Sequence, residues 1–193
     1  MKNLKTITLG AAFITSAILA ISACNSTPKA DDNTVVATVS GDGKNVTDTN
    51  KDDSAFLVKA AEINLEEIKL GQLAQQNTLV PDIKDLGKMM ETDHNKCLDG
   101  LVSLAKKKSI SIPTTLNAAA LDDYQNMSKL AGPAFDKKYS DMMVDGHKEA
   151  IALFEKESTS ASDADIRQWA SATLTGLHKH LEHAIQCQQN CSK

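Results

Sequence analysis

Four titratable side chains stand at positions where the apolar pattern of a helix calls for a hydrophobic residue: Glu67, His94, His147 and His180. A carboxylate or imidazole on a buried helix face is costly unless it is paired, neutralised or bound to an ion. Glu and His side chains that converge from several helices of a bundle are typical ligands of transition metals. These residues are therefore candidate ligands of an Fe, Mn, Zn or Cu ion.

Glu91 extends this set, because residues at i and i+3 share one face of a helix and Glu91 precedes His94 by three. Carboxylate-bridged metal sites in bundles use the same Glu-x-x-His spacing. Asp93 and Asp145 lie close in sequence to two of the histidines, which makes them candidates for orienting the ligands.

Simpler explanations of the same residues stay open. A slightly rotated helix would place Glu67 at a seam, where its carboxylate reaches water. Each buried histidine could instead be a core residue satisfied by ordinary hydrogen bonds. His178 and His183 lie off the apolar stripe and are interpreted as surface residues, although His180 and His183 also form an HxxH pair.

The helices that must position these residues follow from apolar residues recurring every three or four positions. Long helices are expected over residues 53–77, 81–108 and 133–158, with a fourth that opens at Ser162-x-x-Asp165 and runs toward the C-terminus. Asp53 or Ser54 is the expected N-cap of the first helix. Pro81 and Pro133 suit the first turn of the next two long helices, where a missing N–H costs little.

The connections between these helices indicate their arrangement. The short link 78–80 makes an antiparallel hairpin, and so does the turn before Ser162. The longer segment 109–132 is expected to cross the length of the bundle and to contain a short amphipathic helix, 117–130, with Leu121, Tyr124 and Leu130 facing inward. The sequence thus predicts an all-α four-helix bundle with a long crossover, containing a short helix, between its second and third long helices.

The N-terminal 23 residues have the layout of an export signal, with Lys2 and Lys5 before the apolar run 7–21. The run ends in Ile-Ser-Ala-Cys24, which resembles the lipobox of bacterial lipoproteins, so Cys24 is the expected lipidation site. An ordinary signal cut near Ala23 is the alternative. The expected organisation is a signal peptide (1–23), a lipidated cysteine with a disordered polar tether (24–52), and a bundle domain (53–193).

Composition excludes several functions. The formal net charge is −4 and no basic stripe is present, which argues against nucleic-acid binding. No Gly-rich phosphate loop, nucleophile elbow or CxxC motif supports catalysis.

Cys97 and Cys187 are expected at different heights of the bundle and therefore unbonded. Cys187 and Cys191, one helical turn apart, are either free thiols or a disulfide.

Several segments together resemble a bacterial family, the domain of unknown function 4142, commonly labelled "predicted outer membrane protein" and placed with ferritin-like bundles. They include METDHNKC around His94, a segment of the expected helix 133–158 that ends HKEAIALFEKE, and LTGLHKHLEHA around His180. The resemblance implies a ferritin-like four-helix bundle and no settled activity. The fourth long helix has Leu177 where ferritins carry the Glu of a Glu-x-x-His, so the resemblance implies the fold more than ferritin chemistry.

Two functions follow as hypotheses. The first is an exported lipoprotein, anchored by Cys24 to the outer membrane and facing the periplasm, with a non-catalytic structural, interaction or stress role. The second is a metal-binding bundle, with redox activity as one version of the hypothesis, that uses the Glu and His ligands named above. Protein partners and oligomeric state are not determined by the sequence.

Overall fold

The computed structural model describes residues 46–191, with side chains from residue 51 onward. Within that range the chain forms five helices and no strand: α1 (Val46–Asn77), α2 (Pro81–Lys107), α3 (Ala118–Met127), α4 (Gly132–Ser160) and α5 (Ala164–Cys191). The predicted all-α bundle is confirmed. The expected signal peptide, the lipidation site at Cys24 and most of the expected tether lie outside the described residues.

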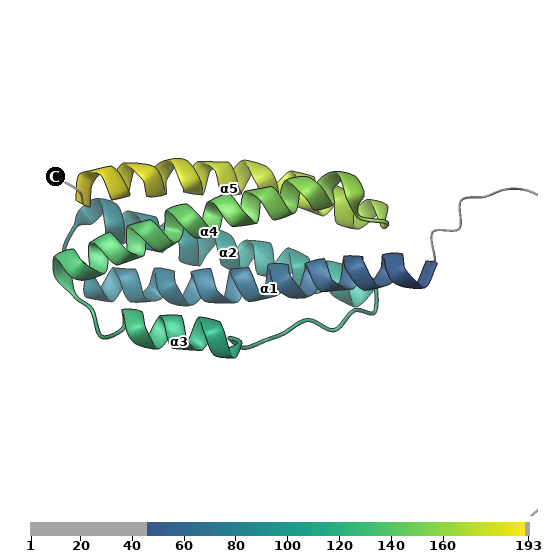
Figure 1. Ribbon diagram of the computed structural model, residues 1–193, viewed down its shortest axis with the longest axis horizontal. Coiled ribbons are helices and arrows are strands. Elements are labelled where there is room, and N and C mark those ends of the chain that lie inside the picture. The colour runs from purple at the N-terminus through teal and green to yellow at the C-terminus, as the bar shows by residue number, and fades with distance from the viewer. Residues whose placement is uncertain (1–45, 192–193) are drawn as a thin grey trace, which may run out of the picture. The chain divides into compact units, whose positions relative to one another are not determined.

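Two helical hairpins, α1–α2 and α4–α5, pack against each other through α2 with α5 and α1 with α4 (Figure 1). Each neighbouring pair runs antiparallel, because the segment between α2 and α4 returns along the bundle before α4 begins. The short helix α3 lies in this crossover, against α1. The predicted long crossover with its short helix is therefore present.

Two glycines bring α1 and α2 into unusually close contact. A Cβ at Gly71 would lie 2.6 Å from the carbonyl oxygen of Gly87, and a Cβ at Gly87 would lie 2.8 Å from the carbonyl oxygen of Gly71. Real Cβ atoms do not approach backbone oxygens so closely, so only glycine allows this helix separation. The close contact fixes the height of α2 relative to α1.

The interior divides into two apolar clusters. One surrounds Phe56 and Phe154 near the α4–α5 turn, and the other surrounds Phe135 and Met90 near the α1–α2 turn. Each long helix passes from one cluster to the other. On α2, for example, the passage lies between Met90 and Leu101, and His94 occupies it. A buried polar layer thus lies between the two apolar cores, and it consists of Asn64, Glu67, His94, His147 and His180.

Helix α1 begins at Val46, before the Asp53 or Ser54 start that the sequence pattern predicted. Asp53 is buried inside the helix, where its carboxylate accepts the backbone N–H groups of Ser162 and Asp163, each at 2.8 Å. It therefore satisfies the α4–α5 turn instead of capping its own helix.

Two smaller expectations were wrong. Helix α5 is capped by Asp163, whose carboxylate accepts the N–H groups of Asp165 and Ile166, rather than by Ser162. Leu121 is exposed, because α3 turns Ala120 and Met127 inward. Among the described helices, none is long and apolar enough to span a membrane.

Candidate metal centre

Three buried histidines meet in the polar layer: His94 from α2, His147 from α4 and His180 from α5. One ring nitrogen of each lies within 4.8 Å of one ring nitrogen of each of the others. The ring centroids are separated by 5.2 to 5.7 Å. Residues distant in sequence therefore form one compact imidazole cluster.

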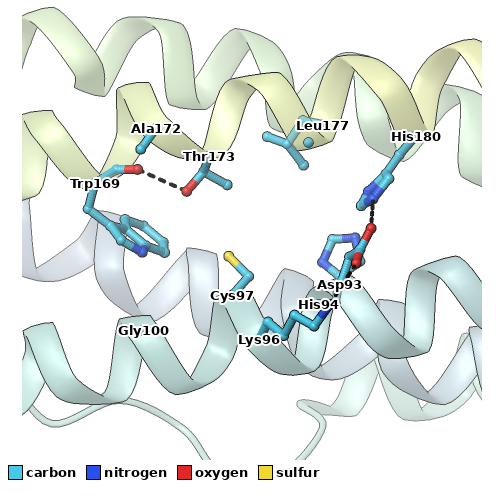
Figure 2. Close-up of a pocket in the computed structure, with 11 residues that line it drawn as sticks. Asp93, His94, Lys96, Cys97, Gly100, Trp169, Ala172, Thr173, Leu177 and His180 are labelled. Carbon is cyan, nitrogen blue, oxygen red and sulfur yellow. Dashed lines mark hydrogen bonds and ion pairs between the residues drawn. The ribbon is translucent and has the colours of Figure 1, made fainter.

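Each histidine uses one nitrogen to bind a group outside the cluster. His147 Nδ1 donates to the carbonyl oxygen of Met143 at 2.8 Å, and His180 Nε2 donates to Asp93 Oδ2 at 3.1 Å (Figure 2). His94 Nδ1 donates to Asn64 Oδ1 at 3.0 Å. Exchanging the oxygen and nitrogen of the Asn64 amide would lose a hydrogen bond, because its Nδ2 donates to the carbonyl oxygen of Ala60 at 2.7 Å.

These outer partners determine the tautomers, because a carbonyl oxygen and a carboxylate accept hydrogen bonds and do not donate them. The remaining nitrogens are His94 Nε2, His147 Nε2 and His180 Nδ1, and in the neutral rings all three carry lone pairs. His147 Nε2 lies 3.4 Å from His180 Nδ1, and His94 Nε2 has no hydrogen-bond partner among the described residues. Facing lone pairs repel one another, so this arrangement is satisfied by a cation.

Protonation of the histidines does not supply this positive charge near neutral pH. Burial, reinforced by the two other rings, lowers the pKa of His94 well below its ordinary value. Burial and neighbouring His180 lower the pKa of His147 to about 4. Burial also lowers the pKa of His180, although Asp93 offsets part of this effect. Near neutral pH the three rings are therefore uncharged, which is the form that binds metal.

The distance between the inner nitrogens of His147 and His180 fits a metal ion bound by both rings. Two nitrogens, each ~2.1 Å from a tetrahedral ion, lie roughly 3.4 Å apart, which matches the His147–His180 separation. Each ring also has the outward hydrogen bond that metal-ligating histidines usually make. The three imidazoles would hold such an ion through three of its four tetrahedral positions, which would leave one position for water or another ligand.

Glu67, from α1, lies beside this cluster but on the far side of His147. Its Oε1 is 3.8 Å from His147 Nδ1, the nitrogen that binds the Met143 carbonyl. Burial, and to a lesser extent Glu66, raises the pKa of Glu67 to about 8. Glu67 Oε2 and the Tyr139 hydroxyl are both buried without a hydrogen-bond partner in the described part of the chain. Glu67 is thus buried within the bundle and adjoins the imidazoles without joining their inner face.

The other predicted site residues have separate positions. Glu91 accepts hydrogen bonds from Gln72 at 2.9 Å and Gln75 at 2.7 Å, away from the histidines. Asp145 is exposed, with its carboxylate 4.0 Å from Lys148 Nζ. Asp93 does orient a histidine, but this is His180 on another helix rather than its sequence neighbour His94.

Asn64 is a part of the site that the sequence pattern missed. It is buried on α1, on the same face as Ala60 and Glu67, and it positions His94. His94 is thus paired with Asn64 of α1, whereas Glu67 of the same helix lies beside His147. The sequence did contain a signal for Asn64, because this polar residue lies one helical turn from both Ala60 and Glu67, on the face predicted to be buried. The three described cysteines, Cys97, Cys187 and Cys191, are free thiols.

Two pockets approach the layer from opposite seams of the bundle. One, of about 320 Å³ between α2 and α5, is lined by His94 and His180 together with Cys97, Trp169 and Leu177 (Figure 2). The other, of about 340 Å³ between α1 and α4, is lined by Glu66, Glu67 and Glu149. The first pocket reaches two imidazoles directly, whereas the second reaches the buried carboxyl group.

Fold and site together define a helical-bundle protein with a buried three-histidine centre. The chain matches the family described as a domain of unknown function (DUF4142) over residues 39–187, and it belongs to this family. The resemblance inferred from the sequence segments is thereby confirmed. No curated protein and no solved structure gives a significant match.

Proposed function

We propose that this protein is a lipid-anchored cell-envelope bundle that binds one transition-metal ion through His94, His147 and His180. The observation that carries the metal assignment is the hydrogen-bond pattern of the three rings. Every outer nitrogen donates to a fixed acceptor, and the three remaining nitrogens converge as lone pairs. A histidine buried only for packing needs no such convergence.

The donor set narrows the identity of the ion. Three neutral imidazoles without a carboxylate in their inner face suit Zn, Cu or Fe better than Mn, which prefers oxygen ligands. When bound, such an ion would act as a Lewis acid or, for Cu and Fe, as a redox centre. The chain's own part is to hold the rings, through Asn64, Asp93 and the Met143 carbonyl, and to surround them with apolar residues.

Metal content is the direct test. The full chain, purified in detergent and exposed separately to Zn²⁺, Cu²⁺ and Fe²⁺, is expected to retain about one equivalent of metal. His147→Ala is expected to retain far less, whereas His178→Ala, at an exposed histidine of α5, retains as much as the wild type. His94→Gln, closer in size to histidine, serves as a second variant, and circular dichroism verifies that each variant folds.

Sub-stoichiometric metal in the wild type, or equal loading of His147→Ala and His178→Ala, would contradict the metal assignment. A non-catalytic structural role in the envelope would then be the better hypothesis for the function of the protein.

The envelope location is supported by the export-signal pattern and by the Ile-Ser-Ala-Cys24 sequence. An acylated cysteine holds a protein at a membrane without spanning it. Cys24→Ser is expected to move the protein from the membrane fraction to the soluble periplasmic fraction. An unchanged membrane fraction for this variant would contradict lipidation at Cys24. The expected destination, the outer membrane facing the periplasm, is tested by separating the two membranes.

A further inference from the structure

The pocket between α2 and α5 connects the outside of the bundle with two of the three imidazoles. His94 and His180 form part of its wall, and His147 does not. A ligand that completes the coordination of an ion held by the three rings would therefore extend into this pocket. Figure 2 shows Trp169 and Cys97 farther along the same pocket, beyond His94.

The wall opposite the histidines is flat, apolar and firmly held. The Trp169 ring packs against Phe154 and Phe56, with centroid distances of 5.4 and 5.9 Å. Both phenylalanines belong to the apolar cluster behind it. Leu177 adds a buried aliphatic surface beside His180. A flat hydrophobic group gains contact with such a wall without ordering flexible side chains.

The charged groups at the pocket largely cancel one another. Asp93 and Lys96 are its charged lining residues, and their side chains lie 3.7 Å apart. The second Asp93 oxygen is already bound to His180. The wall therefore offers no unpaired counter-charge for a charged ligand body. Its volume of about 320 Å³ is near the lower end of the range for small-molecule sites, roughly 300–1,000 Å³.

We propose that this pocket binds a small, neutral, flat nitrogen donor of the azole class, whose nitrogen completes the metal coordination while its ring or apolar substituent lies against Trp169 and Leu177. This inference rests on the proposed metal site and adds the ligand class and the route of access. The donor nitrogen replaces a coordinated water, so the step is a ligand exchange without a change in oxidation state.

The test uses Co²⁺-loaded full chain in detergent, with imidazole, 4-phenylimidazole and azide as probes. Cobalt absorption reports coordination. Trp169 is the single tryptophan of the sequence, so its fluorescence reports occupation of the pocket. 4-Phenylimidazole is expected to bind about tenfold more tightly than imidazole or azide, since burial of a phenyl group is worth at least that much. It alone is expected to change Trp169 emission strongly.

A matched pair of variants tests whether the azole binds in this pocket. Nothing lies within 4 Å of a Cβ placed at Gly176, which lines the pocket, so the Cβ of Gly176→Leu enters without a clash and the longer side chain occupies space at the pocket. This variant is expected to abolish the advantage of 4-phenylimidazole while retaining Co²⁺ and its affinity for imidazole. Thr175→Leu changes the neighbouring exposed position and is expected to behave like the wild type.

Metal content after gel filtration separates the two ways in which the inference can fail. A wild-type protein that retains no Co²⁺ overturns the metal site and this inference together. Retained Co²⁺ with equal affinity for the two azoles, with tighter azide binding, or with no effect of Gly176→Leu overturns the ligand assignment alone.

Discussion

Single hydrogen bonds outside the imidazole cluster decide how its rings face. His94 depends on an amide of α1, His147 on a carbonyl of its own helix, and His180 on a carboxylate of α2. The Asp93 bond is the most exposed of the three, since 37 % of the Asp93 side chain is accessible. It is therefore the one that substitution can test with the least damage to the core.

Asp93→Ala is expected to weaken metal binding by roughly 10- to 100-fold, the usual effect of removing a partner that orients a metal-ligating histidine. Asp93→Asn keeps an acceptor oxygen and is expected to recover much of this loss. Isothermal titration with Zn²⁺ measures both effects. Asp99→Ala, at an exposed position of α2, is the control, and equal affinities for Asp93→Ala and Asp99→Ala would exclude the orienting role.

Glu67 is expected to make the metal-free protein less stable as the pH rises. Its pKa is about 8 in the folded state, against an ordinary value of 4.5, so the folded state holds the proton more tightly than the unfolded state between these values. The stabilisation is fully present below about pH 4.5 and is lost as the pH rises through 8, by up to a few kcal/mol.

Glu67→Gln removes this titration. Urea unfolding with chelator present is expected to show that the variant loses less stability than the wild type between pH 6.5 and 8.5. Parallel curves for the two proteins over this interval would mean that the Glu67 carboxyl is ionised, and therefore solvated or paired, in the folded state.

At the scale of helices, the separation of α1 and α2 depends on two glycines that face each other. A methyl group at position 71 would lie 2.6 Å from the Gly87 oxygen and 3.0 Å from the Glu91 nitrogen, both of which are backbone atoms. Backbone atoms cannot move aside as a flexible side chain can, so α2 would have to shift. A shift of α2 also moves His94.

Gly71→Ala is therefore expected to destabilise the protein by about 1–3 kcal/mol, the usual cost of overpacking, and to weaken metal binding at the same time. Gly176→Ala is the matched control, because its methyl group meets nothing within 4 Å and removes the entropic cost of glycine in a helix. It is expected to stabilise by up to ~1 kcal/mol. Thermal melts compare the two, and equal stabilisation would show that the helices are not in close contact.

For the whole molecule, the polar layer separates two apolar cores that each long helix joins. A metal ion would connect α2, α4 and α5 at this layer, so metal binding and folding are expected to be thermodynamically linked. The described cysteines are free, which leaves metal binding as the candidate cross-link between the hairpins.

Chelation is accordingly expected to lower the melting temperature. Binding stabilises the folded state by about 4 kcal/mol at a free metal concentration 1,000 times the Kd, which corresponds to roughly 10 °C for a chain of this size. Differential scanning calorimetry with and without EDTA measures the shift. The shift is expected to disappear in His147→Ala, and a shift of equal size in that variant would place the ion elsewhere.

Patterns along the chain were enough to predict the all-α fold, the two hairpins, the long crossover and the inward-facing histidines. These follow from local regularities: the 3.6-residue period, the proline positions and the lengths of connections. The sequence also carried the family resemblance. The start of α1 could not be predicted from the sequence, because Asp53 acts as a capping residue for a turn more than a hundred residues away.

The packing of the helices against one another determines which side chains share one centre and how each ring is oriented. Periodicity places a residue on a face of its helix but does not fix the rotation or height of that helix against three neighbours. A displacement of about one helical turn along α1 is enough to bring Asn64 rather than Glu67 to His94. The observed packing also places Glu67 beside the outer nitrogen of His147, and it leaves Glu91 bound to two glutamines.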